Sequence, residues 1–212
     1  MTNRWMLGTA LFCALLAGCT TGPAPGIDAR PYDQQIAEWR KAKDDAFKST
    51  GKESGSPIPT EQRAAFAGLT YYDVDPSYHV PAELKLEPSN PPVIIELQTS
   101  AAAERDKYMR VGWLYFTLAG ESYKLIAFAE NQELTRLFVP FGDLTNGSDT
   151  YRGGRFLDLD RTASGIYDLD FNRAYNPFCV YNPSFICPIP PRENRLPVPI
   201  RAGERLGPSA HR

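Results

Sequence analysis

Residues 168–201 read DLDFNRAYNPFCVYNPSFICPIPPRENRLPVPIR, and this stretch organises the fold. Its first residues alternate aspartate with leucine and phenylalanine, which is the pattern of a half-buried strand. The prolines that follow exclude both a helix and a regular ladder, because proline lacks the backbone N–H and has a fixed φ. A disordered linker would be poor in aromatic residues, whereas this segment contains Tyr175, Phe178, Tyr181 and Phe185. We therefore expect an ordered cover over the rest of the domain.

Two cysteines, Cys179 and Cys187, lie within this cover. We expect them to form a structural disulfide that clamps the cover, provided that the protein resides in an oxidising compartment. The alternatives are a redox dithiol and a metal site. Redox pairs usually lie two residues apart at the start of a helix, and no nearby histidine completes a zinc site.

The first residues have the features of a targeting segment. Arg4 provides a positive charge, and the apolar run Met6–Leu16 is short for a membrane span. Residues 16–19, Leu-Ala-Gly-Cys, resemble the lipobox of bacterial lipoproteins, in which the chain is cut before the cysteine and lipid is attached to its thiol. We therefore expect a signal peptide over 1–18 and lipidation of Cys19. The alternative is an ordinary secretory signal cut nearby.

The predicted location is the bacterial cell envelope, with the lipid on Cys19 as the contact with the membrane. In enteric-type bacteria, an aspartate directly after the lipidated cysteine retains lipoproteins in the inner membrane. Here that position holds Thr20, so the periplasmic face of the outer membrane is expected if the source is Gram-negative. The predicted organisation is a lipidated tether (19–32), a helical segment (33–67), a β domain (68–203) and a flexible tail (204–212).

Period-3.6 and period-2 patterns divide the chain into a short helical part and a long β part. Asp33 is the expected N-cap of a first helix that ends near Ser49–Gly51, and a short second helix runs from Thr60 to about Ala67. The clearest β signal is the hairpin of residues 108–118 and 121–129, joined at Ala119-Gly120. Further strands are expected at 69–74, 79–87, 93–97 (a central strand) and 137–141, and a second hairpin at 156–160 and 166–171.

These elements predict a mainly β fold, either an antiparallel β-sandwich or a partly open barrel. One or two N-terminal helices and the proline-rich, disulfide-clamped C-terminal cover complete it.

Composition excludes several classes of function. The 212-residue chain has a formal net charge of −2, whereas nucleic-acid-binding proteins usually have a basic surplus or patch. It has two histidines, His79 and His211, which excludes a histidine-rich metal site. The sequence contains no P-loop, dinucleotide fingerprint or G-x-S-x-G elbow. We expect no cofactor, no metal, no nucleic acid and no catalytic residue.

Four acids, Asp158, Asp160, Asp168 and Asp170, would share one face if the second hairpin pairs as expected. A calcium site or an acid/base pair is one interpretation. A solvated strand face is favoured, because half-buried strands alternate in this way. Gly153-Gly154 before Arg155 could cradle an anion, but a turn is favoured.

Amides, guanidinium groups and a phenol gather beside the irregular backbone of the cover. Such groups suit hydrogen bonding to a ligand's hydroxyls or carboxylates, but they also satisfy buried carbonyls that no ladder serves. Both interpretations stay open. The candidate ligand-binding residues are Asp143, Arg155, Asn172, Arg173, Tyr175, Asn176, Glu193, Asn194 and Arg195.

Several stretches resemble the bacterial family known as domain of unknown function 1684. The resemblance spans about residues 35–204. It rests on residues 39–40, 65–72, 74–76, 137–141, 143–145, 150–151, 154–158 and 170–177, on Cys179, and on the pairs CP (187–188), PP (190–191) and EN (193–194). Gly142, where the family usually has a basic residue, and Phe178, where it usually has proline, depart from the pattern. The departure at Gly142 weakens an anion site in that loop. The resemblance implies no activity.

The sequence favours a non-catalytic binding module for a small polar or glycan ligand in the envelope. One alternative is a carboxylate-dependent hydrolase acting on envelope material. The other is a structural module that docks to another envelope protein. Two acids that converge in a cleft would indicate the hydrolase. A pocket with polar groups but without such a pair would indicate the binding module, and an exposed apolar patch would indicate the docking module.

Overall fold

The structure, a computed structural model, describes residues 28–49, 55–88, 92–129, 136–160, 162, 164–207 and 210. The predicted signal peptide and Cys19 lie outside these residues. The chain divides after Arg30, and the unit that begins at Pro31 contains all the elements described below.

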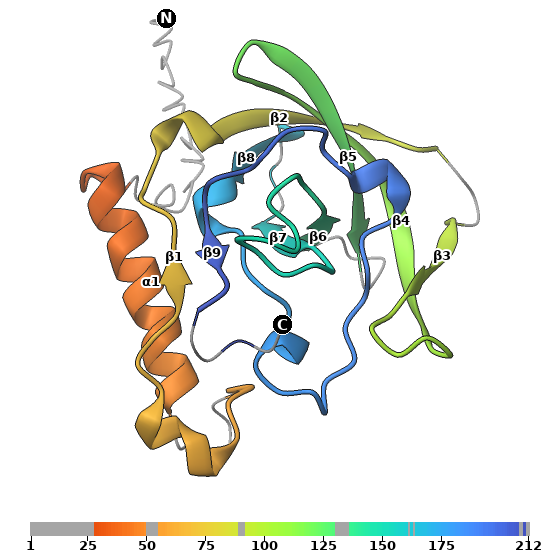
Figure 1. Ribbon diagram of the computed structural model, residues 1–212. Coiled ribbons are helices and arrows are strands. Elements are labelled where there is room, and N and C mark those ends of the chain that lie inside the picture. Colours follow the sequence, from red (N-terminus) through yellow and green to blue (C-terminus); the bar gives the residue numbers. More distant parts are fainter. Residues whose placement is uncertain are drawn as a thin grey trace, which may run out of the picture. The chain divides into compact units, whose positions relative to one another are not determined.

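Six antiparallel strands form a nearly closed barrel, in the order β7-β6-β5-β4-β2-β8 (Figure 1). The two end strands, β7 and β8, approach each other without pairing. This arrangement confirms the mainly β prediction and decides between its two forms in favour of the partly open barrel. The strands are β2 (His79–Leu86), β4 (Arg105–Leu118), β5 (Glu121–Ala129), β6 (Arg136–Phe141), β7 (Arg155–Asp160) and β8 (Ile166–Asp170).

The β4–β5 hairpin is the longest ladder of the barrel and confirms its prediction. Leu118 pairs with Glu121, and the two turn residues, Ala119 and Gly120, have φ values of 51° and 85°. Positive φ at both central residues is the type I′ geometry that matches strand twist. Further along β4 the register shifts at Gly112, where a Cβ would lie 2.1 Å from the Lys85 carbonyl oxygen. Glycine there lets β2 lie against the bend.

The N-terminal helix α1 (Tyr32–Lys48) packs on the domain through Ile36 and Phe47, which are both buried. The predicted N-cap is wrong, because Pro31 holds that position and Asp33 lies in the first turn. Proline's fixed φ suits a helix start. A short 3-10 helix, Thr60–Ala65, follows where the second helix was expected. Among the described helices, none has the length and apolarity to cross a membrane.

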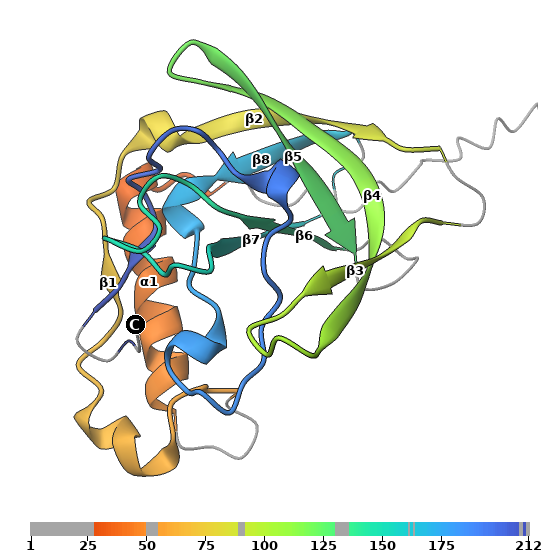
Figure 2. The same ribbon diagram turned by 45° about the vertical axis from the view of Figure 1, so that its right-hand side comes forward.

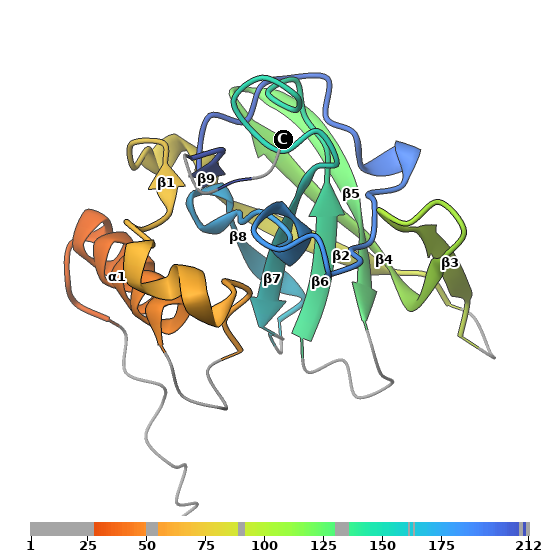
Figure 3. The same cartoon turned by 60° about the horizontal axis from the view of Figure 1, so that its bottom comes forward.

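A separate two-stranded ladder lies beside α1 (Figure 3). It joins β1 (Thr70–Tyr71) to β9 (Glu204–Arg205). The predicted tail, 204–212, therefore begins as a strand, and Glu204 is fully buried. The backbone of residues 204 and 205 therefore has partners in this ladder.

Strand β3 (Ile94–Gln98) is not the central strand that the sequence predicts. It pairs with β4 alone and lies off the main path of the sheet (Figure 2). The side chain of Ile94 is 58% exposed. A run of β-branched residues is typical of a buried strand, but the position of the strand in the sheet decides its burial.

The two strands of the predicted second hairpin both form, but they do not pair with each other, so the predicted hairpin is wrong. β7 pairs with β6, and β8 pairs with β2. On the open edge of β7, Phe156 exchanges two backbone hydrogen bonds with Tyr175, of 2.9 and 3.0 Å. The segment after β8 thus takes the place that β8 would occupy.

The cover is the segment 171–203. It descends from β8 to a 3-10 helix at Phe178–Val180, rises to another at Arg192–Asn194 beside β5, and arcs over to β9 (Figures 1 and 2). Phe171, Leu196 and Ile200 join the barrel core, while Val180 and Tyr181 pack with Phe47 of α1. The prediction of an ordered cover is confirmed, because these apolar side chains stabilise a path that has few ladder bonds.

Candidate functional site

A pocket of about 450 Å³ lies between the outer face of the barrel wall and the cover. Alternation along the strands explains its position. Leu137 and Val139 of β6 and Leu157 of β7 point into the barrel core, so the residues between them point outward. Six aromatic side chains line the pocket: Tyr108, Phe138, Phe156, Tyr175, Phe178 and Phe185.

Three polar side chains meet on the pocket wall. The Asp158 Oδ2 atom accepts a 2.8 Å hydrogen bond from the Tyr175 hydroxyl and lies 3.0 Å from Nη2 of Arg136. Burial and the Asp158 charge raise the pKa of Tyr175, so its phenol remains a donor. The Arg136 side chain is 64% exposed and that of Asp158 is 22% exposed. Both charged groups can therefore reach a ligand.

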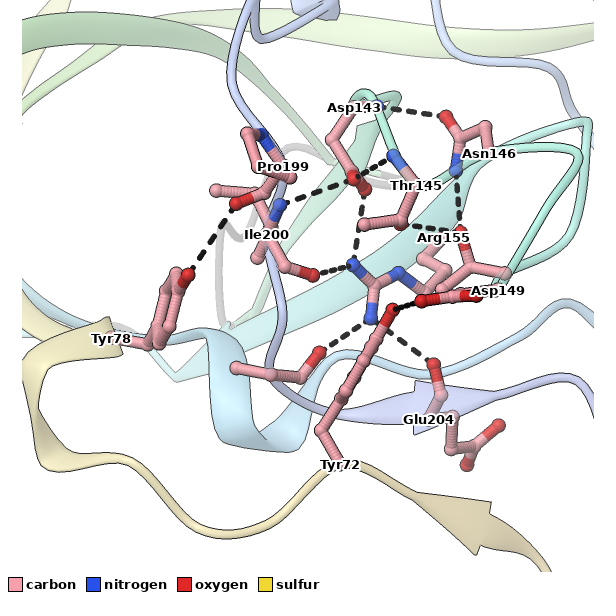
Figure 4. Close-up of polar contacts among 12 residues, drawn as sticks. Tyr72, Tyr78, Asp143, Thr145, Asn146, Asp149, Arg155, Pro199, Ile200 and Glu204 are labelled. Carbon is pink, nitrogen blue, oxygen red and sulfur yellow. Dashed lines mark hydrogen bonds and ion pairs between the residues drawn. The ribbon is translucent and has the colours of Figure 1, made fainter.

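Arg155, a predicted ligand-binding residue, is instead fully buried at the start of β7 (Figure 4). Its guanidinium donates to the carbonyl oxygens of Ile200 (2.7 Å), Ala202 (2.5 Å) and Glu204 (3.1 Å). It also donates to Asp143 Oδ2 at 3.0 Å, and the side chains of this ion pair are both 0% exposed. The guanidinium thus binds the backbone of the C-terminal segment, and the carbonyls of Ile200 and Ala202 lie outside the strands.

Asp143 completes the same network. Its Oδ1 atom accepts from the backbone N–H groups of Thr145 (2.8 Å) and Ile200 (3.2 Å). The glycine pair before Arg155 forms the favoured turn. At Gly154, φ is +94° and a Cβ would lie 2.6 Å from the carbonyl oxygen of Phe141. Positive φ and this close approach require glycine.

Three asparagines that the sequence predicts as ligand-binding residues are fully buried, and their side chains bond to backbone groups. The Asn194 amide accepts from the Ile126 N–H (2.7 Å) and donates to the carbonyls of Ile126 (2.9 Å) and Pro140 (2.7 Å). Asn172 bonds in the same two-way manner to the backbone of Asp75. Asn176 donates to the Arg205 carbonyl. The amides of Asn172 and Asn194 thus take the place of a ladder partner for the backbone.

The other predicted site residues lie apart from one another. Tyr175 lines the aromatic pocket. Arg173 is half-exposed, and its Nε lies 3.2 Å from Asp170 Oδ2. Glu193 and Arg195 lie on a second groove of about 410 Å³, beside β3. As ligand contacts, all nine residues remain predictions; the structure brings Tyr175 alone of them to the aromatic pocket.

The four acids do not share a surface. Asp158 lines the pocket, and Asp168 is exposed and contacts His79. Asp170 is buried because α1 covers it, and Tyr32 donates to its Oδ1 atom at 2.7 Å. The separation follows from the unpaired edges of β7 and β8. Within the described part of the chain, no group of three or more His, Cys, Asp or Glu side chains could hold a metal ion.

Cys179 and Cys187 are thiols in the structure, and they lie in contact. The backbone N–H of Cys179 is 3.2 Å from Cys187 Sγ. The predicted disulfide is thus not formed here and remains a prediction, while the two residues that it requires lie together.

Sequence reasoning missed four strand residues that line the pocket, namely Tyr108, Arg136, Phe138 and Phe156. A signal for it exists in residues 136–141 and 155–160. In both strands large apolar residues occupy both faces, as in Leu137-Phe138 and Phe156-Leu157. A strand with one solvated face alternates instead. This pattern indicates that something covers the outer face of the barrel wall here.

The fold and the pocket define a small β-barrel whose outer wall, closed by a C-terminal cover, forms an aromatic cavity. The family model described as "Protein of unknown function (DUF1684)" matches residues 64–205, and the chain belongs to this family. The solution NMR structure of an uncharacterized protein from Haloarcula marismortui is 39% identical, with a TM-score of 0.63, and the match covers 82% of this chain and 94% of that one. No protein of curated function matches.

Proposed function

We propose that this protein is a non-catalytic binding module of the bacterial cell envelope, and that the aromatic pocket binds a small polar or glycan ligand. The observation that carries the proposal is the meeting of six aromatic rings with the Arg136–Asp158 pair in one cavity. Ligand sites in proteins are concave and mostly apolar, with a few placed polar groups that orient the ligand.

A sugar ring suits this combination. Its faces carry C–H groups that stack on aromatic rings, and its edge carries hydroxyls. The Asp158 carboxylate would accept from hydroxyls, and the Arg136 guanidinium would donate to hydroxyl or carboxylate oxygens. Both described contacts of Asp158 reach Oδ2, which leaves Oδ1 without a hydrogen bond to any described residue.

The alternatives are less well supported by the same geometry. Glycoside hydrolysis through carboxylates needs two acids that flank the scissile bond. Among the described residues that line the pocket, Asp158 is the single acid. A docking module would need an exposed apolar patch. Phe185 and Ile186 at the rim are 38% and 43% exposed, so a protein partner is the alternative that the binding screen below must exclude.

The pocket predicts a ligand-dependent rise in the melting temperature of the purified protein. Sugars, muropeptides and organic acids are screened by thermal shift, because a ligand that binds only the folded state stabilises it by mass action. Asp158→Asn should weaken binding of a hit roughly 10-fold, which corresponds to the ~1.4 kcal/mol scale of one hydrogen bond to a charged group. Arg136→Gln should weaken it similarly.

Glu83→Gln is the matched control, since Glu83 is an exposed carboxylate on β2, away from the pocket. It should leave the affinity of the hit unchanged. A hit that Asp158→Asn and Arg136→Gln do not weaken would place the ligand elsewhere. The absence of any shift across the panel would count against small ligands and in favour of a protein partner.

We further propose that the protein is anchored to the membrane by lipid on Cys19, at the periplasmic face of the outer membrane if the source is Gram-negative. The lipobox-like residues 16–19 support this placement. The Cys19→Ala variant should lose incorporation of labelled palmitate and leave the membrane fraction. Cys13→Ala is the control and should keep both, because Cys13 would be removed with the signal. Palmitate labelling of Cys19→Ala would disprove the anchor.

A further inference from the structure

One thiol of the pocket wall, Cys187, and its neighbour Cys179 have no role in the proposed function. Cys187 lines the aromatic pocket and is 7% exposed. Cys179 lies against it, with its backbone N–H 3.2 Å from Cys187 Sγ, and is partly exposed. The pair closes a loop of the cover that also carries Phe185 and Ile186, which line the same pocket.

Hydrogen bonds from the Cys187 thiol, the Tyr151 hydroxyl and the Ser100 hydroxyl lower the pKa of Cys179 to about 7, although burial opposes them. These donors come from three separate segments of the chain. A thiol with a lowered pKa and some exposure is the nucleophile in thiol–disulfide exchange. The hydrogen bond with Cys179 and, after it, burial raise the pKa of Cys187.

The loop between the two cysteines is anchored at both ends. At its start Val180 and Tyr181 are buried and pack with Phe47 of α1, and the Asn182 side chain donates to the Pro57 carbonyl at 3.1 Å. Its end is held by Ser100, whose N–H donates to the Cys187 carbonyl at 2.8 Å and whose hydroxyl accepts from the Cys187 N–H at 3.1 Å. Within the loop, Pro183, Ser184, Phe185 and Ile186 are all exposed. This exposed tip, which carries Phe185 and Ile186, is therefore the part of the pocket wall that closure of the loop can restrain.

We infer that Cys179 and Cys187 form a thiol–disulfide exchange site whose closed form fixes the wall of the aromatic pocket. The co-reactant is a disulfide, either of a small thiol such as glutathione or of a protein. The Cys179 thiolate attacks one sulfur of the co-reactant, and the other sulfur leaves as a thiolate that takes up a proton. Cys187 loses its proton, attacks Cys179 Sγ and displaces the second thiol. The two cysteines are oxidised, and the co-reactant is reduced to two thiols.

The link between this exchange site and binding rests on the proposed function, whereas the chemistry does not. Closing the loop removes conformational freedom from the chain segment that carries Phe185 and Ile186. A ligand that contacts these side chains then loses less entropy on binding. The oxidised protein should bind the ligand more tightly than the reduced protein.

The chemistry is tested with oxidised and reduced glutathione as the probes. Trypsin cuts after Arg173 and Arg192, so both cysteines fall in one peptide whose mass reports free thiols, a glutathione adduct or the disulfide. The wild type should form the disulfide, and its melting temperature should rise by roughly 5–10 °C. Cys187→Ser should accumulate the adduct on Cys179, while Cys179→Ser should react much more slowly at buried Cys187.

Tyr151→Phe separates an exchange site from an ordinary structural disulfide. It keeps the ring but removes one donor to Cys179, so exchange at pH 7 should slow several-fold as the thiolate fraction falls. Hydrogen exchange of peptide 174–192, measured without ligand, should be slower after oxidation.

Free thiols that persist in excess oxidised glutathione would overturn the inference. An unchanged rate in Tyr151→Phe would disprove the assigned nucleophile, and unchanged hydrogen exchange would disprove the link to the pocket. These readouts need no ligand, so failure of the ligand screen leaves them standing. Conversely, a ligand that binds both redox forms equally would support the proposed function and overturn the redox link.

Discussion

Arg155→Met should lower the free energy of unfolding by about 3–5 kcal/mol, the cost of breaking a buried ion pair. Methionine fills the site with an unbranched apolar side chain but leaves the Asp143 carboxylate buried without its cation. It also leaves the carbonyls of Ile200, Ala202 and Glu204 without the donors that they now have. Chemical denaturation should show the loss directly, as a lower midpoint with an unchanged m-value.

Two further variants test this explanation. Arg152→Met, an exposed arginine three residues earlier, should change stability by less than about 0.5 kcal/mol. The double variant Arg155→Met, Asp143→Asn should be more stable than Arg155→Met alone, because it removes the unpaired buried charge. If Arg155→Met unfolds at the wild-type midpoint, the guanidinium does not hold the cover to β7.

Asn194→Ala should destabilise the protein by about 3–5 kcal/mol, because each buried polar group left unpaired costs about 1–3 kcal/mol. Three backbone groups lose their partner, namely the N–H and C=O of Ile126 and the C=O of Pro140. The amide is needed at this point because β5 and β6 pair directly at Phe128 and Phe138 alone among the described residues. It therefore joins the two strands where they diverge.

Hydrogen exchange gives the residue-level readout for this variant. The Ile126 amide should exchange much faster in Asn194→Ala, while the Leu125 amide, one residue away and paired in register with Leu114 of β4, should retain more of its protection. Glu193→Ala is the matched control, since Glu193 is exposed beside Asn194, and should leave stability within about 0.5 kcal/mol. Equal exchange of the Ile126 amide in wild type and Asn194→Ala would contradict the bridging role.

Local patterns predicted most of the elements but not their partners. The β4–β5 hairpin follows from adjacent strands and a turn at Ala119-Gly120, whose geometry the neighbouring residues determine. The pairing of β7 and β8 was predicted by the same reasoning and is wrong. Adjacency in the chain favours a hairpin, but closure of the barrel gives both strands other partners, and Tyr175 occupies the open edge of β7.

The sequence predicts only part of the candidate site, again because a local pattern does not show what each side chain contacts. Amides and guanidinium groups in an irregular segment suit either a ligand or the segment's own carbonyls, and their residue types do not distinguish the two. The structure shows Arg155, Asn172, Asn176 and Asn194 fully buried and bonded to backbone groups. Tyr175 reaches the aromatic pocket, beside charged residues from β6 and β7.

Elements whose causes are local can be predicted from the sequence. These are the turn residues, the alternation of the barrel strands, and the proline-rich cover that must use side chains in place of a ladder. Three features are visible only in the tertiary structure. The strands form a barrel whose end strands, β7 and β8, do not pair. The cover crosses the outer wall of this barrel, and a pocket forms between the two. The physical reason is that a ladder partner and a pocket both depend on segments far apart in the chain, which packing of the whole core brings together.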